Sequence, residues 1–110
     1  LAMDLDFYKD LPKNFPAMDA KSFFEGNEKF TYDTAFRNSS IQGGYLIKAC
    51  HILGLSTGPM SGFNNEGVDQ EFFKGTNIKS NFLCNIGYGD EQHTFPKAPR
   101  YEFKDIIEIL

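Results

Sequence analysis

A long segment of periodic apolar residues, ended by a glycine, limits what this chain can fold into. This spacing predicts a helix from Thr34 to Leu53 whose apolar face packs against the rest of the protein. Asp33 precedes it as a candidate N-cap, and Gly54 follows it where helices often end in the left-handed conformation. The apolar residues recur at intervals of four, with two more beside them: Ile41, Tyr45, Ala49 and Leu53, then Leu46 and Cys50.

A Gly-Pro-x-x-Gly segment follows the predicted helix almost directly. Between Gly58 and Gly62 few side chains obstruct close approach, and Pro59 fixes one φ angle and removes one amide donor. We expect a loop here, against which a flat ligand could lie. Taken alone the signal is weak, because two glycines and a proline more often only turn the chain.

Shorter elements are expected before the long helix. Residues 1–5 read as the end of a strand, and residues 6–11 as a helical turn closed by Pro12. Asp19 can cap a short helix that runs to Phe24. The chain therefore reaches the long helix through an irregular surface excursion.

Further elements are expected after the Gly-Pro-x-x-Gly segment. A short helix begins at Asn64 or Asn65 and ends at Gly75, and residues 81–86 read as a strand. Together with the long helix, these elements predict an α+β fold. A final apolar-periodic tail must pack on this chain or on a second subunit, and its apolar residues are Phe103, Ile106, Ile107 and Leu110.

Composition excludes several classes of function. A net charge of -4 with scattered Lys and Arg argues against a nucleic-acid groove. No apolar run approaches the roughly 18 residues of a membrane span, so the chain is expected to be cytoplasmic. Cys50 and Cys84 lack CxxC spacing and are predicted to be buried thiols in a reducing compartment. Twelve Phe and five Tyr indicate a Phe-rich core or rings that face a partner.

No side chains are arranged for metal binding or for nucleophilic attack. His51 and His93 have no second ligand at useful spacing, so both are expected to be structural. The acidic residues near the N-terminus are too irregularly spaced for a metal site, and they are Asp4, Asp6, Asp10 and Asp19. We therefore predict neither a catalytic side chain nor a metal.

Four runs of the sequence resemble the flavin-dependent nitroreductase family, and they occur in the same order as in that family. They are Thr34–Leu55, Thr57–Phe63, Lys79–Gly89 and Lys97–Arg100, and they most resemble the malonic semialdehyde reductase branch of pyrimidine catabolism. The resemblance covers the C-terminal portion of the family's domain. It implies that residues 1–110 are part of one FMN-binding domain, that N-terminal flavin-binding motifs lie outside this sequence, and that the isolated chain could be inactive.

The resemblance also implies a cofactor site. Pro59, Met60, Ser61 and Gly62 match the segment that lies over one face of the FMN ring in the family, where main-chain amides address the nitrogen that receives hydride. Many relatives have Glu where this chain has Ser61. Lys97 lies between two prolines and Arg100 directly follows the second. Both match phosphate-binding positions, although solvated surface charges are the plain alternative.

The implied reaction passes hydride from NAD(P)H through FMN to a second substrate. That substrate is a small aldehyde acid such as malonic semialdehyde, or a nitro or quinone acceptor. The family also implies a homodimer embraced through C-terminal extensions. A non-catalytic Phe-rich interaction module or flavin-binding fragment is the alternative. Arg37 and Asn38 match the branch closely, and a dimer, substrate-channel or solvent-facing role stays open for both.

Overall fold

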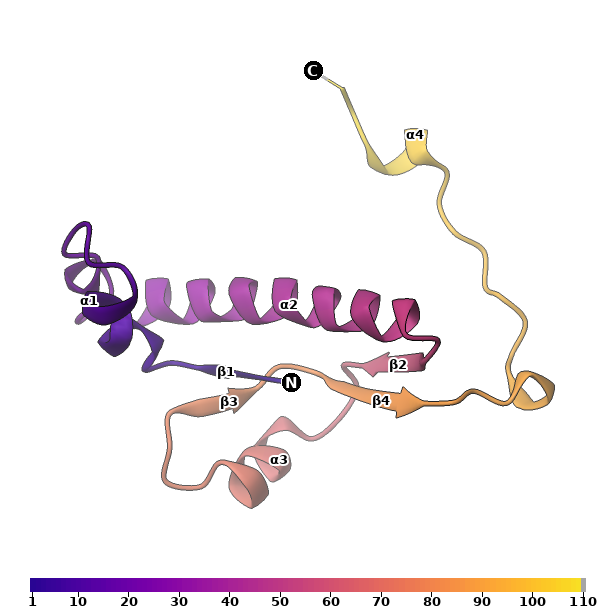
Figure 1. The fold of residues 1–110 in the computed structure, drawn as a ribbon, viewed down its shortest axis with the longest axis horizontal. Helices are drawn as coiled ribbons and strands as arrows, with labels where there is room; N and C mark the ends of the chain where they lie inside the picture. Colours follow the sequence, from indigo (N-terminus) through magenta and orange to yellow (C-terminus); the bar gives the residue numbers. More distant parts are fainter. Residues whose placement is uncertain (110) are drawn as a thin grey trace.

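A computed structural model describes residues 1–109, apart from the side chain of Glu91. Its longest element is a 25-residue helix, α2, which lies along one side of the strands (Figure 1). The elements in chain order are β1 (Ala2–Asp4), η1 (Phe7–Asp10), α1 (Leu11–Asn14), η2 (Lys21–Phe23), α2 (Glu28–Ile52), β2 (Ser56–Met60), α3 (Asn65–Phe72), β3 (Ile78–Ser80), β4 (Leu83–Gly87), η3 (Glu91–His93) and α4 (Phe103–Ile106).

Helix α2 starts six residues before the predicted Thr34. Asn27 is its N-cap, and the Asn27 side chain accepts a hydrogen bond from the Phe30 amide at 3.2 Å. Asp33, the predicted cap, lies within the helix and forms an ion pair with Lys29 at 2.6 Å. The prediction was wrong because both residues can cap a helix, and the chain between them is also helical.

The C-terminal end of α2 agrees with the prediction. Gly54 adopts a φ of 76°, and its amide donates to the His51 carbonyl at 3.1 Å. The Leu55 amide donates to the Cys50 carbonyl at 2.9 Å, which completes a Schellman motif. This turn sends the chain directly into β2.

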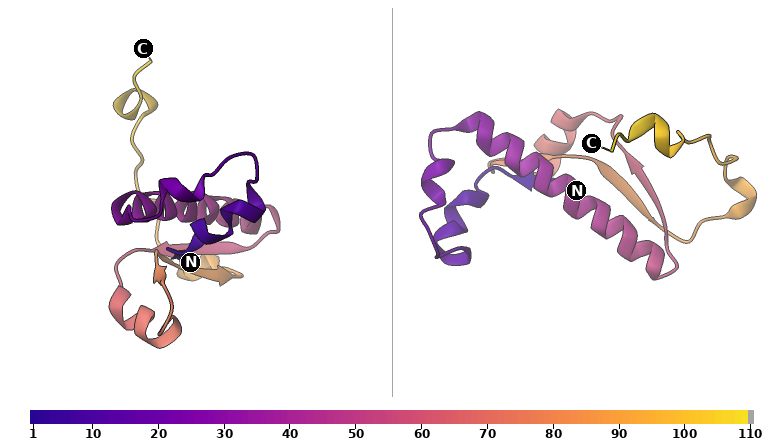
Figure 2. Two further views of the ribbon diagram at one scale, coloured as in Figure 1. Left: turned by 90° about the vertical axis from the view of Figure 1, so that its left-hand side faces the viewer. Right: turned by 90° about the horizontal axis from the view of Figure 1, so that it is seen from above.

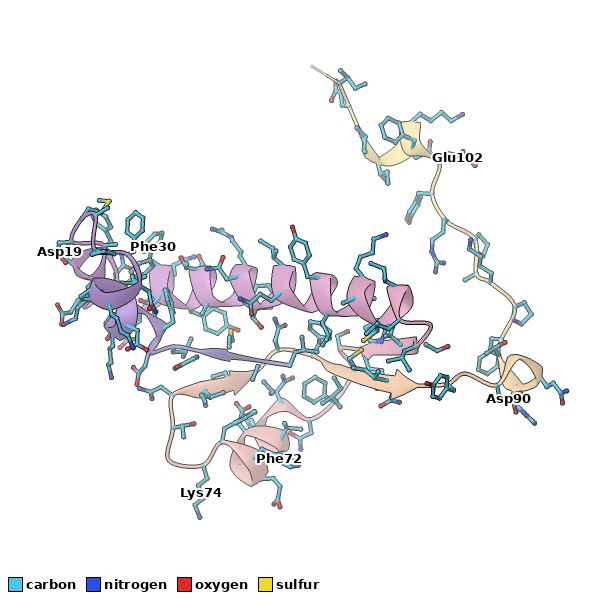
Figure 3. All side chains as sticks on the ribbon, in the orientation of Figure 1. Asp19, Phe30, Phe72, Lys74, Asp90 and Glu102 are labelled. Atoms are coloured by element: carbon cyan, nitrogen blue, oxygen red, sulfur yellow. The ribbon has the colours of Figure 1, made fainter. Side chains whose placement is uncertain are left out.

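The face of α2 that packs on the strands differs from the predicted one. Its buried residues are small, and they are Thr31, Ala35, Gly43 and Cys50. Ile41, Tyr45 and Leu53 are instead 58%, 73% and 75% exposed. Small side chains let β1 and the 81–82 segment approach the helix axis, whereas the bulky apolar stripe is left uncovered. Figure 3 shows side chains projecting from α2 on the side away from the strands.

Two antiparallel strand pairs lie beside α2. β1 pairs with β3 in the register Ala2↔Ser80 to Asp4↔Ile78, and β2 pairs with β4 in the register Ser56↔Gly87 to Met60↔Leu83. The strand expected over residues 1–5 is confirmed, and the strand expected over 81–86 is shifted to β4. Strand β3 was not predicted, because three residues are too short for a clear alternating pattern.

The N-terminal excursion is helical in short pieces. Pro12 lies in the first turn of α1 and does not close a helix there, because its fixed φ suits a helix start. The N-cap of the 3-10 turn η2 is Ala20, so the predicted Asp19 cap was wrong, although the Asp19 side chain accepts from the Ser22 amide at 3.4 Å. After the Gly-Pro-x-x-Gly segment, α3 begins at its cap Asn64 as expected.

Residues 88–109 extend away from the rest of the chain (Figures 1 and 2). The apolar side chains of this tail are exposed, including Phe103, Ile106 and Ile107 at 63%, 63% and 47%. The tail therefore does not pack on the body of its own chain, and Leu110 lies outside the described residues. Within residues 1–109, no helix is both long and apolar enough to cross a membrane.

The two cysteines are both free thiols. Cys50 is buried on the inner face of α2, whereas Cys84 on β4 is partly exposed. The prediction of buried thiols is confirmed for Cys50 only. The described chain has a small core, in which Met3 and Ala35 accompany Cys50.

Candidate functional site

The predicted ring-contact segment is a strand end followed by a turn. Gly58, Pro59 and Met60 belong to β2 and pair with residues of β4, so the expectation of a loop was wrong for these three residues. Proline is tolerated because β2 has a strand partner on one side only within residues 1–109. Ser61 follows the strand, and its carbonyl accepts from the Phe63 amide at 3.1 Å.

The segment is open to solvent. Pro59, Ser61 and Gly62 are exposed, and Met60 is 40% exposed. A Cβ at Gly62 would have no described atom within 4 Å, and a Cβ at Gly58 would make an ordinary 3.8 Å contact with Asn85. The main chain at the end of β2 can therefore be approached closely by a flat group.

The helix side of the segment is fixed by the end of α2. The Schellman turn leads into β2 within two residues, and Thr57 Oγ1 lies 3.0 Å from His51 Nε2. This contact joins the last turn of α2 to the strand that carries Pro59. His51 thus makes a positioning contact at the candidate site.

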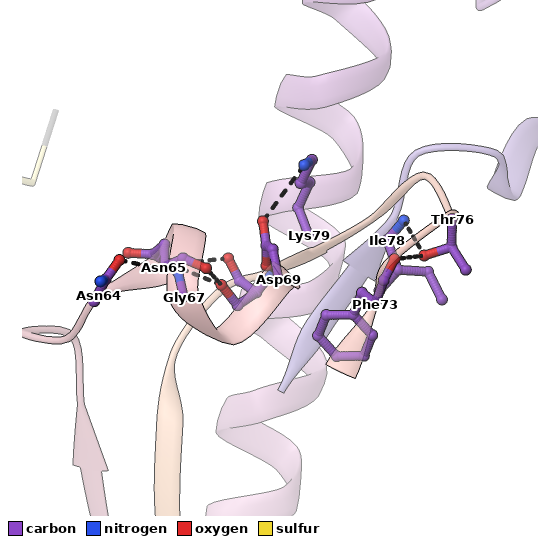
Figure 4. A network of polar contacts seen from close by, with 9 residues as sticks. Asn64, Asn65, Gly67, Asp69, Phe73, Thr76, Ile78 and Lys79 are labelled. Carbon is purple, nitrogen blue, oxygen red and sulfur yellow. Dashed lines mark hydrogen bonds and ion pairs between the residues drawn. The ribbon is translucent and has the colours of Figure 1, made fainter. Parts of the chain in front are cut away.

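The other side of the segment is fixed by a polar network between α3 and β3 (Figure 4). Asn65 Nδ2 donates to the carbonyl and the hydroxyl of Ser80, at 3.2 and 3.0 Å. The Ser80 amide donates to Asp69 Oδ1 at 2.7 Å, and Lys79 lies 3.5 Å from the same carboxylate. Since α3 begins three residues after Gly62, this network holds the far end of the turn.

Asp69 is the acidic centre of this network. The hydrogen bond from the Ser80 amide is the main cause that lowers the pKa of Asp69, and the Lys79 charge adds to it. Its side chain is only 16% exposed, so the carboxylate is mostly covered by its partners. Sequence reasoning missed this network, because Asn65 and Ser80 are far apart in the chain and polar pairs carry no periodic signal.

A second unpredicted network ties α2 to the strands. Asn81 Nδ2 donates to Ser39 Oγ at 3.2 Å and to Ser40 Oγ at 3.1 Å. Ser39 Oγ donates to the Ala2 carbonyl at 3.0 Å. This network fixes the segment between β3 and β4 on the helix, and so it also fixes the strand that pairs with β2.

The predicted phosphate residues lie in the extended tail. The Arg100 guanidinium donates to the carbonyls of Ala98 and Pro99 at 3.0 and 3.2 Å, and Lys97 forms no ion pair within residues 1–109. Figure 1 shows the tail leading away from the end of β4. The structure therefore does not bring Lys97 and Arg100 together with Pro59–Gly62 in one chain.

Other candidate residues have simpler surroundings. Arg37 and Asn38 are exposed on α2, and the Arg37 charge contributes to lowering the pKa of Asp33 after the larger effect of Lys29. His93 Nδ1 lies 2.7 Å from Asp90 Oδ2. Among residues 1–109, no group of three or more His, Cys, Asp or Glu side chains is arranged to hold a metal ion.

The chain is similar in sequence to proteins whose names agree with the family that its motifs resemble. The chain is 54% identical over 109 residues to a Burkholderia lata protein named "Putative NADH dehydrogenase/NAD(P)H nitroreductase", covering 99% of this chain and 56% of that protein. A Polynucleobacter asymbioticus protein of the same name is 54% identical over 110 residues, with 56% of its length covered. The chain thus spans about half the length of these relatives. No protein-family model matches it.

A solved structure has the same fold. The crystal structure of "putative nitroreductase ydfN" from Bacillus subtilis superposes with a TM-score of 0.88 at 21% identity, over 99% of this chain and 61% of that one. The α+β class, with a long helix and short strands, is therefore confirmed. The chain is thus similar in sequence, over almost its whole length, to proteins named NAD(P)H nitroreductases, and it shares the fold of the Bacillus subtilis structure.

Proposed function

We propose that this chain is part of an FMN-dependent oxidoreductase of the nitroreductase type. The observation that carries the proposal is the exposed main chain from Pro59 to Gly62, which is open on one side and fixed at both ends. His51 and Thr57 hold the strand before it, and the Asn65–Ser80–Asp69 network holds the helix after it. A rigid, accessible backbone is suited to positioning a planar ring.

The described residues fit FMN in part. The open space beside Gly62 leaves room for a ring face, and the amides of Ser61 and Gly62 are donors that require no particular side chain. When bound, FMN would accept a hydride from NAD(P)H and pass it to a second substrate. The contribution of this chain is to orient the ring and to offer hydrogen-bond donors at a fixed position.

The phosphate of FMN needs cations, and the fold of this chain does not place Lys97 or Arg100 beside Pro59–Gly62. Lys97 and Arg100 are our candidates, and the tail that carries them leads away from its own strands (Figure 1). We propose that this tail reaches a second copy of the protein, so that each phosphate site is completed by its partner. The exposed apolar residues of the tail support this arrangement, since they need a surface to cover them.

The proposed substrate is a small aldehyde acid such as malonic semialdehyde. In that reaction the aldehyde carbon gains hydride, its oxygen gains a proton, and NAD(P)H becomes NAD(P)⁺. A nitro or quinone acceptor is the more general case, and the nitro acceptor agrees with the names of the relatives. Ser61 supplies no carboxylate beside the ring, so this position should not repel an acidic substrate.

The test uses the full-length protein. We expect it to be yellow as purified, to quench the fluorescence of added FMN on binding, and to oxidise NADH or NADPH when an acceptor is present. Equilibrium sedimentation should show a dimer. A colourless protein that leaves FMN fluorescence unchanged would instead favour a non-catalytic interaction module, for which the exposed aromatic side chains are the supporting observation.

A further inference from the structure

A cavity of about 730 Å³ lies at the N-terminal end of α2, which we call the α2 N-terminal cavity. Leu5, Tyr8 and Phe24 line one part of it, and the first turns of α2 line another. Its volume is in the range of about 300–1,000 Å³ that is typical of small-molecule sites. It lies at the N-terminal end of the 25-residue α2, whereas Pro59 follows the C-terminal end, so it is separate from the proposed FMN site.

Aromatic rings form a fixed wall of this cavity. The rings of Tyr8 and Phe24 are stacked at 6.3 Å between centroids, and Phe24 stacks on Phe30 at 5.0 Å. Phe7 contacts the Phe24 ring edge-on at 4.9 Å. The buried Thr31 hydroxyl lies 2.9 Å from the Asn27 carbonyl and 3.2 Å from the Phe24 carbonyl and shares its proton between them, which holds this turn against α2. The wall is therefore supported from behind by packing and by a hydrogen bond.

Two of the charged side chains that line the cavity have an ion-pair partner, and a third has none in the part of the chain that the structure describes. Asp6 is paired with Lys9 at 2.9 Å, and Lys29 is paired with Asp33 at 2.6 Å. The carboxylate of Glu28 forms neither an ion pair nor a hydrogen bond within residues 1–109. The cavity thus combines aromatic ring surface with one uncompensated negative charge.

We propose that the α2 N-terminal cavity binds a planar heteroaromatic cation, of the class in which a ring nitrogen carries an alkyl group. The aromatic wall with Tyr8 offers stacking and cation–π contact, and Glu28 offers the opposite charge. A neutral ring of the same shape gains only the stacking. This site is independent of the proposed FMN site and of the reaction assigned to it.

The probe pair is N-methylquinolinium, a planar cation, and quinoline, its neutral counterpart at mildly alkaline pH. We expect equilibrium dialysis with the full-length protein to show that the cation binds about fivefold more tightly than the neutral ring. Glu28→Gln should abolish that preference and leave quinoline binding unchanged. Tyr8→Leu should weaken binding of the cation about two- to fivefold.

Matched variants locate the binding. Glu66→Gln removes a carboxylate from the first turn of another helix, α3, and Tyr101→Leu removes an exposed tyrosine from the tail, so neither should change binding. Gly62→Val, which alters the proposed FMN site, should also leave binding unchanged. The proposal is overturned if neither probe binds, if the cation preference survives in Glu28→Gln, or if Gly62→Val removes it.

Discussion

Gly43 of α2 faces the ring of Phe82 so closely that no side chain fits between them. A Cβ at Gly43 would lie 2.4 Å from Phe82 Cζ and 2.6 Å from Cε1. The neighbouring Gly44 has no described atom within 4 Å of its Cβ position. Two adjacent glycines in one helix therefore have opposite surroundings, a packed ring at Gly43 and open space at Gly44.

Alanine substitution should separate these two glycines. We expect Gly43→Ala to destabilise the fold by about 1–3 kcal/mol, because the Phe82 ring must move. Gly44→Ala should be neutral or stabilising by up to about 1 kcal/mol, because alanine favours the helix. Urea denaturation of both variants measures the difference, and equal stability would show that Phe82 is not held against the helix.

The Asp69 carboxylate should make stability depend on acid. Its pKa is lowered in the folded state, chiefly by the Ser80 amide, so its contribution is fully present above the unfolded value of about 4 and is lost as the pH falls through the folded value. We expect Asp69→Asn to flatten the acid limb of a plot of unfolding free energy against pH. Glu71→Gln on the same helix is the control, and an identical acid limb in both variants would contradict this role.

Gly62 should tolerate a larger side chain in folding but not in cofactor binding. The space beside its Cβ position is open in the described chain, so Gly62→Val should leave thermal stability almost unchanged. The same side chain would obstruct a flat group, and we expect FMN affinity to fall by about tenfold or more. Gly87→Val on β4 is a matched control, because its Cβ position is also open. Unaltered FMN uptake in Gly62→Val would place the ring elsewhere.

Arg100 should affect cofactor retention without affecting the fold. Its guanidinium contacts only nearby carbonyls of the tail within the described residues. Loss of a charge-assisted hydrogen bond to phosphate costs about 1.5–3 kcal/mol, so Arg100→Ala should weaken FMN binding about tenfold to a hundredfold. Lys97→Ala should have a smaller effect, and Lys104→Ala should have none. Equal FMN affinity in Arg100→Ala and Lys104→Ala would remove Arg100 from the phosphate site.

Local chemistry identified the end of α2 better than its beginning. Gly54 was recognised as the stop of α2 because few other residues adopt a positive φ so readily, and the structure gives it 76°. The start was misplaced because Asn27 and Asp33 are both good caps, and sequence alone does not choose between them. The tight turn of α2 into β2, which leads the chain to Pro59, followed from the correct end.

The face of α2 could not be predicted from periodicity. Apolar residues occur on more than one side of the helix, and the bulky stripe through Ile41 and Tyr45 gave the clearer pattern. The strands instead pack on the small residues, because Gly43 allows the Phe82 ring to approach. The uncovered stripe is a surface that another part of the protein or a second copy would need to cover.

The sequence by itself determined the α+β class, the long helix with its glycine stop, and the Gly-Pro-x-x-Gly segment, since each depends on residues close together in the chain. Tertiary structure alone decided that Pro59 and Met60 pair with β4. It also decided that Asn65, Asp69 and Ser80 contact one another, and that the tail with Arg100 extends away from the strands of its own chain. The physical reason is the same in each case. These contacts join residues distant in sequence, and their partners are fixed only when the whole chain packs.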